Sequence, residues 1–99
     1  MDLLTTPKIA RKLREKHKVS ESEVFQCFLN RRRKYVEELR DEHRTDPPTL
    51  WLIAQTDSGR RLKVILIRYS KTQIILKSAY EPNFEEMRIY HETLKRGLS

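Results

Sequence analysis

The stretch "RLKVILIRYSKTQIILKSAYEPNFEEMRIY", residues 61–90, decides the fold of this 99-residue chain. Its first twenty residues are rich in β-branched and apolar types, with one polar interruption near Ser70 and Lys71. This pattern predicts two long strands joined by a tight turn. Pro82 cannot donate a hydrogen bond to a strand ladder, so the second strand ends before it.

A helix is predicted directly after these strands. Asn83 and Glu86 have the spacing of an N-cap residue and the third helical residue, and they favour a helix from about Phe84 to Arg96. Glu85 lies in the first turn, where the helix dipole favours negative charge. Capping alone explains a glutamate at position 86.

Two further helices are predicted near the start of the chain. In "TTPKIARKLREKHK", residues 5–18, Pro7 suits the first helical position. In "KVSESEVFQCFLN", residues 18–30, Ser20 and Glu23 have the spacing of a capping box. Cys27, on the apolar face of the second helix, is predicted to be a small buried hydrophobic residue.

The middle of the chain predicts one more strand, "TLWLIAQT" (residues 49–56), followed by the turn "DSGR". "KYVEEL" (residues 34–39) fits either a short strand or an extension of the second helix, and "RDEHRTDPP" predicts a loop. Short turns make neighbouring strands antiparallel. The expected fold is therefore one α+β domain, residues 1–99, with two N-terminal helices, an antiparallel meander of three to four strands and a C-terminal helix.

Side-chain alternation in the strands predicts which residues share a face. In the strand after the "DSGR" turn, the side chain of Lys63 is expected on one face of the sheet and those of its neighbours Leu62 and Val64 on the other face. In the last strand, strict alternation places one set of residues on one face and the other set on the opposite face; the sets are Ile74, Leu76, Ser78 and Tyr80, and Ile75, Lys77 and Ala79. Alternation does not decide which face is buried, because both sets are largely apolar.

The composition bears on partners and compartment. With 21 Lys and Arg against 14 Asp and Glu, the net charge of +7 favours a nucleic acid or an acidic protein as partner.

The single cysteine allows no internal disulfide, and no signal peptide or membrane-length apolar run is found, so a cytoplasmic protein is expected without a membrane partner. The histidines and the cysteine lack metal-ligand spacing and no glycine-rich phosphate loop is found, so neither a metal nor a cofactor is expected.

Three groups of residues are candidates for a functional site. Basic residues at strand ends either bind phosphate, or are solvated charges that keep the sheet from pairing with the strands of another molecule. These residues are Arg60, Arg61, Lys63 and Lys77. The densest basic cluster, a candidate for nucleic-acid binding, is Arg31, Arg32 and Arg33. In "RDEHR", His43 could transfer protons with Asp41 orienting it, although a solvated charged loop is the simpler interpretation.

Four segments, taken in order, resemble the BrnT toxin family. The opening of that family is similar to "KHKVSESEVFQCF", and the family has an Asp and a His where this chain has "DEHR". The "GR.L.V" hairpin of the family is similar to "TDSGRRLKVILI". Its "I.IISAR.A…E…Y" ending is similar to "IILKSAYEPNFEEMRIY". The resemblance covers about residues 9–90. The positions that match are Asp41, His43, Gly59, Arg60, Leu62, Ser78, Ala79, Glu86 and Tyr90.

The resemblance implies a RelE-like fold and a toxin of a type II toxin–antitoxin pair, which acts as a metal-independent ribonuclease and is neutralised by a cognate antitoxin. One departure is that Tyr80 stands where the family has an Arg. Relatives that share "TDPPTLW" and "AYEPN" often carry the transferred label ADP-ribosyl-dinitrogen reductase hydrolase. That activity needs a larger metal-binding fold with carboxylate clusters, which this chain lacks.

The leading hypothesis is a toxin-like ribonuclease in which the 2′-hydroxyl of RNA is the nucleophile. Lys63, Lys77, Arg60 and Arg61 would contact phosphate, and Tyr80 or His43 would transfer protons. An ordinary tyrosine titrates near 10, so Tyr80 would need neighbouring cations to act as a base. The alternative is a basic module that binds nucleic acid or an acidic antitoxin-like partner without catalysis; a homo-oligomer is also possible.

Overall fold

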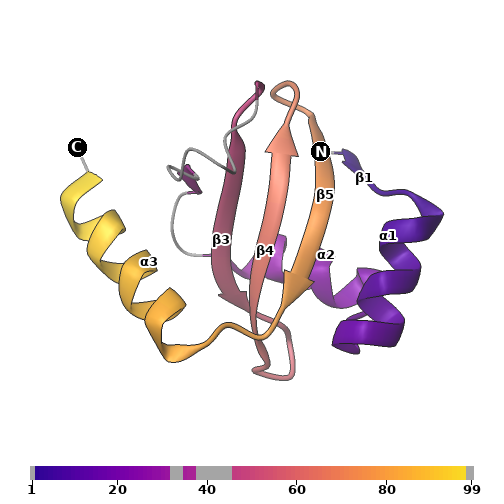
Figure 1. Ribbon diagram of the computed structural model, residues 1–99, viewed down its shortest axis with the longest axis horizontal. Helices are drawn as coiled ribbons and strands as arrows, with labels where there is room; N and C mark the ends of the chain where they lie inside the picture. The colour runs from indigo at the N-terminus through magenta and orange to yellow at the C-terminus, as the bar shows by residue number, and fades with distance from the viewer. Residues whose placement is uncertain (1, 32–34, 38–45, 98–99) are drawn as a thin grey trace.

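The strands and the helix predicted from residues 61–90 are present in the computed structural model, which describes residues 2–31, 35–37 and 46–97. Strand β4 (Arg61–Arg68) pairs antiparallel with β5 (Gln73–Tyr80), and α3 (Phe84–Gly97) follows. Strand β3 (Thr49–Gln55) pairs antiparallel with the other edge of β4. The predicted α+β class is confirmed (Figure 1).

The sheet is larger than the predicted meander. Its order is β1-β5-β4-β3-β2, where β2 (Val36–Glu37) is antiparallel to β3 and β1 (Asp2–Leu4) is parallel to β5. The sheet is therefore mixed. Strand β2 lies within residues 34–39, where a short strand was one of the two predicted alternatives. Strand β1 was not predicted, because three residues are too few to show the two-residue periodicity on which a strand prediction depends.

Both N-terminal helices form where they were predicted. Helix α1 (Pro7–Lys12) continues into the π-helical segment η1 (Leu13–His17), and Lys18, the residue after η1, has a left-handed φ of 55°. Helix α2 (Glu21–Asn30) begins with the predicted capping box: the Glu23 amide donates to Ser20 Oγ at 3.1 Å, and the Ser20 amide donates to Glu23 Oε1 at 3.0 Å.

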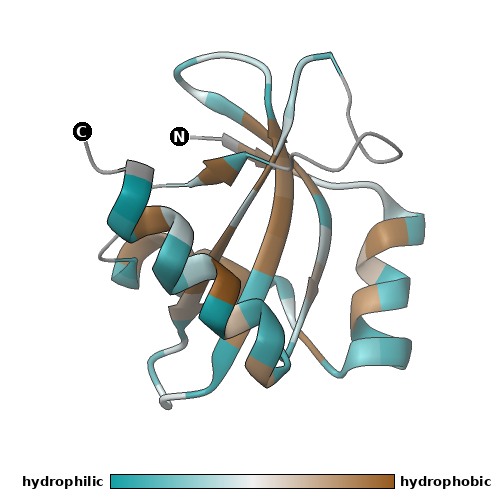
Figure 2. Ribbon diagram, turned by 60° about the vertical axis from the view of Figure 1, so that its left-hand side comes forward, coloured by the Kyte–Doolittle hydropathy of each residue, from teal (hydrophilic) through white to brown (hydrophobic). Residues whose placement is uncertain are grey.

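The helices cover the two faces of the sheet unequally. Helix α2 lies behind the sheet in Figure 1, and its Cys27 thiol contacts the Ala54 carbonyl at 3.7 Å. We call this side the α2 face. Helix α3 lies on the opposite side against β3, where the Tyr90 ring is 5.3 Å from the Trp51 ring. In Figure 2 the strands are mostly brown and the outer surface of α3 is mostly teal, so the core lies between the sheet and the helices.

Cys27 is completely buried, as predicted. Burial, followed by the negative charge of Glu23, raises the pKa of its thiol to about 11. A thiol with so high a pKa is almost entirely protonated at neutral pH, so Cys27 serves packing rather than reactivity.

A β-bulge changes the predicted faces of β5. Ile65 lies opposite Ser78 while Leu66 lies opposite Leu76, so Lys77 has no partner in the register. Alternation resumes after this extra residue with the opposite parity. The predicted alternation is therefore wrong for the end of β5, where Tyr80 projects from the sheet face opposite the α2 face.

No helix within residues 2–31, 35–37 and 46–97 combines the length and the apolar character needed to cross a membrane.

Candidate functional site

Three side chains from three elements meet on the sheet face opposite α2. Lys63 and Tyr80 are directly opposite each other on β4 and β5. Glu86, from the first turn of α3, accepts hydrogen bonds at the same oxygen, Oε2, from Lys63 Nζ at 2.8 Å and from the Tyr80 hydroxyl at 2.8 Å. We call these three residues the Glu86 cluster.

The helix cap holds Glu86 in this position. The backbone amide of Asn83 donates to Glu86 Oε1 at 3.0 Å, and the backbone amide of Glu86 donates to the side-chain oxygen Oδ1 of Asn83 at 2.7 Å. The predicted cap is thus confirmed, but it uses only one carboxylate oxygen. The second oxygen faces the sheet, so the start of α3 delivers a carboxylate to Lys63 and Tyr80.

The ammonium group of Lys63 is enclosed, since only 6% of the residue is exposed. Its Nζ lies 4.5 Å from the centre of the Trp51 ring and 5.9 Å from that of the Tyr80 ring. An ammonium removed from water needs compensation. The Glu86 carboxylate and the two aromatic faces supply it.

Glu86 carries its negative charge at neutral pH. Burial raises the pKa of its carboxyl group, but hydrogen bonds from Lys63, from the Asn83 amide and from Tyr80 outweigh burial and leave the pKa below its usual value. The cluster therefore contains an ion pair whose carboxylate also accepts a hydrogen bond from the Tyr80 hydroxyl.

His17 adds a second group that can transfer protons, and the sequence did not point to it. Its ring lies 5.5 Å from the Tyr80 ring. Burial, followed by the charges of Lys16 and Lys12, lowers the pKa of the His17 imidazole below 6.5, so this ring is neutral at pH 7. Among the helical residues around it His17 had no distinguishing signal, because its proximity to Tyr80 arises only from the tertiary fold.

Arg60, a predicted phosphate ligand, is engaged within the protein. Its Nε donates to Glu81 at 2.8 Å, its Nη1 to Glu23 and to the Lys18 carbonyl, and its Nη2 to the His17 carbonyl at 3.1 Å. The hydrogen bonds that Arg60 donates to Glu81 and then to Glu23 raise the pKa of this guanidinium. Arg60 therefore joins η1, α2 and the segment after β5, and its contact with the His17 carbonyl places that residue beside Tyr80.

The remaining predicted phosphate ligands are more accessible. Arg61 and Lys77 are exposed, and Arg61 Nη1 contacts Met87 Sδ at 3.4 Å. The Arg31 guanidinium donates to the Phe28 carbonyl at 2.8 Å and lies 5.3 Å from the Tyr35 ring, away from the cluster. The other predicted residues, Arg32, Arg33, Asp41 and His43, lie outside the described residues.

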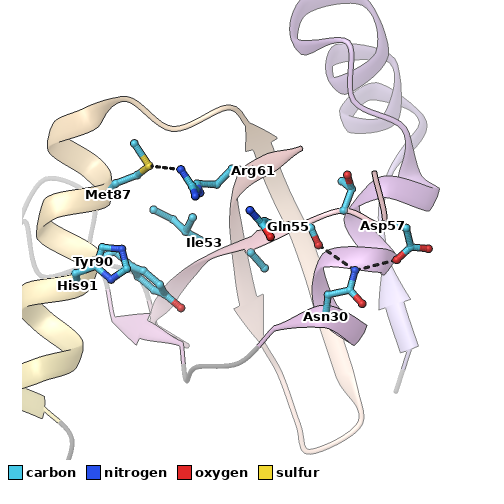
Figure 3. A pocket seen from close by; sticks show the side chains of 10 residues that line it. Asn30, Ile53, Gln55, Asp57, Arg61, Met87, Tyr90 and His91 are labelled. Atoms are coloured by element: carbon cyan, nitrogen blue, oxygen red, sulfur yellow. Dashed lines mark hydrogen bonds between the residues drawn. The ribbon is translucent and has the colours of Figure 1, made fainter. Parts of the chain in front are cut away.

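A cleft of about 630 Å³ lies beside the Glu86 cluster, between β3 and α3. Figure 3 shows its mixed lining, with the Arg61 guanidinium near Met87 and the Tyr90 ring below Ile53. Ile53 is opposite Lys63 in the sheet, so the cleft and the cluster are neighbours. On the far side, the Asn30 amide donates to the Gln55 carbonyl and to Asp57 Oδ1.

The fold and this site define a small, basic α+β protein with a hydrogen-bonded cluster of a lysine, a glutamate and a tyrosine on one sheet face. Neither a protein-family model nor a curated protein matches the chain.

Proposed function

We propose that this protein is a toxin-like endoribonuclease that cleaves RNA without a metal ion and is neutralised by an acidic antitoxin. One observation supports it above all: Tyr80, hydrogen-bonded to an ionised Glu86, lies against a neutral His17 in a protein of net charge +7. A neutral imidazole and a phenol are a suitable base and acid for the two proton transfers of RNA cleavage. The order of sequence segments that resembles the BrnT family supports the same function.

The proposed reaction needs no group beyond RNA and the protein. The 2′-oxygen forms a bond to the adjacent phosphorus while the bond from phosphorus to the 5′-oxygen breaks. His17 takes the proton of the 2′-hydroxyl, and the Tyr80 hydroxyl gives its proton to the leaving 5′-oxygen. The products are a 2′,3′-cyclic phosphate and a 5′-hydroxyl end, and proton exchange with water restores both side chains.

The remaining residues have supporting roles in this proposal. Arg61 and Lys77 are the exposed cations able to contact the phosphate whose charge grows in the transition state. Lys63 and Glu86 act as positioning residues, because their charges are already paired and they hold the Tyr80 hydroxyl at a fixed place. The Arg that the BrnT family has at position 80 would then be replaced by cations at positions 61 and 77.

Tyr80→Phe is expected to reduce the rate of RNA cleavage by about 100-fold, because it removes the acid and leaves the ring contacts in place. The measurement is single-turnover cleavage of end-labelled RNA in EDTA, with identification of the cyclic-phosphate product. Tyr69→Phe is the matched control, since Tyr69 is an exposed tyrosine at the end of β4. Equal cleavage by the wild type and Tyr80→Phe would refute the assigned role.

The pH dependence of cleavage is expected to identify His17 as the base. A base works only when it is unprotonated, and the pKa of His17 is lowered, so the wild-type rate should rise with pH and level off with an apparent pKa below 6.5. His17→Gln should lose this acidic limb together with most of the rate. An unchanged limb in His17→Gln would show that another group is titrating.

A second candidate function is favoured by the pairing within the Glu86 cluster. Glu86 neutralises Lys63 and occupies the Tyr80 hydroxyl, as expected in a protein that keeps this fold to bind a partner without catalysis. In that case the wild-type protein would bind RNA or an acidic protein but leave RNA intact in EDTA, and a host expressing it alone would grow normally.

A further inference from the structure

A large share of the positive charge of this protein lies on its first helix and the segment that continues it. Residues 8–18 contain six Lys and Arg against one acidic residue, which gives +5 of the net +7 of the chain. All six cations are exposed on α1, on η1 or at the residue that ends η1. We call them the basic helix surface; they are Lys8, Arg11, Lys12, Arg14, Lys16 and Lys18.

This arrangement does not favour folding. Lys8, Lys12 and Lys16 follow one another at four-residue spacing, where like charges on a helix repel. Cations near the end of a helix do suit its dipole, but Lys8 lies in the first turn, where the dipole opposes it. The basic helix surface therefore carries a cost to stability that an anionic partner would relieve.

Helix α3 shows the contrasting arrangement. The Arg88 guanidinium pairs with Glu85 and Glu92 on the same helix. Within the described part of the chain, none of the six cations of the basic helix surface forms such an ion pair. The charge of Arg88 is thus paired within its own helix, whereas the six cations of α1 and η1 remain available.

The basic helix surface borders the candidate active site. Helix α1 lies beside β5, toward one edge of the sheet, whereas α3 lies beside β3, toward the other edge (Figure 1). Its continuation η1 ends at His17, whose ring is 5.5 Å from that of Tyr80. The charges of Lys12 and Lys16 reach this imidazole and contribute to lowering its pKa. A polyanion bound along α1 would therefore arrive at Tyr80.

We propose that the basic helix surface binds the phosphate backbone of single-stranded RNA and directs the strand to Tyr80. Binding does not depend on cleavage; only the destination of the strand rests on the proposed function. On the α-helical part of this surface, Lys8 and Lys12 are four residues apart and therefore lie about 6 Å apart along the axis of α1, which is comparable to the spacing of phosphates in an extended single strand. An acidic protein partner would be expected to add apolar anchors at its interface. The exposed large apolar side chains nearest in sequence, Leu4 and Phe25, belong to β1 and α2 and not to α1 or η1.

The test uses an RNA that the protein cannot cleave. The probe is a fluorescein-labelled single strand of about 15 nucleotides with 2′-O-methyl riboses, titrated in EDTA at several salt concentrations. Lys8→Gln/Lys12→Gln/Lys16→Gln should bind about 10- to 100-fold more weakly than the wild type near 0.1 M salt, and the slope of log K against log salt should fall by about 2. The matched control is Lys71→Gln/Lys95→Gln/Arg96→Gln, which removes the same charge from the β4–β5 turn and the end of α3 and should change binding by less than about threefold.

Thermal unfolding separates this effect from damage to the fold. Removing the repelling lysines should raise the melting temperature of the first variant by about 2–5 °C while its RNA affinity falls. Equal RNA affinity and salt slope in this variant and the wild type would overturn the proposal, as would an equal loss in the control. Failure of the wild type to bind the probe would also overturn it and leave an acidic protein as the partner. Binding through this surface by a protein that cuts no unmodified RNA would support this proposal and contradict the ribonuclease.

Discussion

Lys63→Met is expected to lower the free energy of unfolding by about 3 kcal/mol. Methionine fills the space of the lysine stem, but the Glu86 carboxylate then lies against the sheet without its cation. Removing one partner of a buried ion pair costs more than the pair itself contributes, because the other charge stays desolvated. The expected loss is at the low end for such pairs, since the Glu86 side chain is 20% exposed and water screens part of its charge. Urea unfolding followed by circular dichroism measures it.

The double variant Lys63→Met/Glu86→Gln tests this explanation. It leaves no unpaired charge, and a glutamine oxygen can still accept from the Asn83 amide, so we expect it to recover at least half of the lost stability. Lys95→Met, a change at an exposed lysine, should alter stability by less than about 0.5 kcal/mol. Strictly additive losses in the double variant would show that the charge left on Glu86 is not the cause.

The parts of the fold that depend on local sequence were predicted correctly. Both capping motifs, at Ser20 and at Asn83, begin helices as expected, because a cap needs only residues within one helical turn. The strand pair β4 and β5 follows from two apolar runs and a short turn. Strand β1 was missed because it depends on the edge of β5, which lies far away in the sequence.

The candidate site was predictable only in part, for a related reason. Lys63 and Tyr80 could be chosen as candidates from residue type and place at strand ends, but their common face results from the bulge at Lys77, which has no sequence signature here. Glu86 could be recognised as a cap, whereas its second hydrogen-bonding role requires the position of α3 on the sheet. His17 reaches Tyr80 only through the folded arrangement of η1 and β5.

Arg60→Ala is expected to lower the free energy of unfolding by about 3 kcal/mol, because one side chain satisfies groups from three segments. Its guanidinium donates to Glu81, to Glu23 in the cap of α2, and to the carbonyls at the end of η1. The residue is partly exposed, at 24% of the side chain, so water replaces some of these bonds and limits the loss. Urea unfolding gives the stability. In the cleavage assay, the variant should also lose rate, because the His17 backbone is no longer held beside Tyr80.

Arg60→Lys distinguishes the geometry of the guanidinium from its charge. An ammonium cannot donate in three directions within one plane, so lysine should restore less than half of the lost stability although the charge is the same. The neighbouring exposed residue provides the control: Arg61→Ala should change stability by less than about 0.5 kcal/mol. Full rescue by lysine would show that positive charge near Glu23 and Glu81 is sufficient. In that case the contacts of Arg60 with the end of η1 would not be what keeps His17 beside Tyr80.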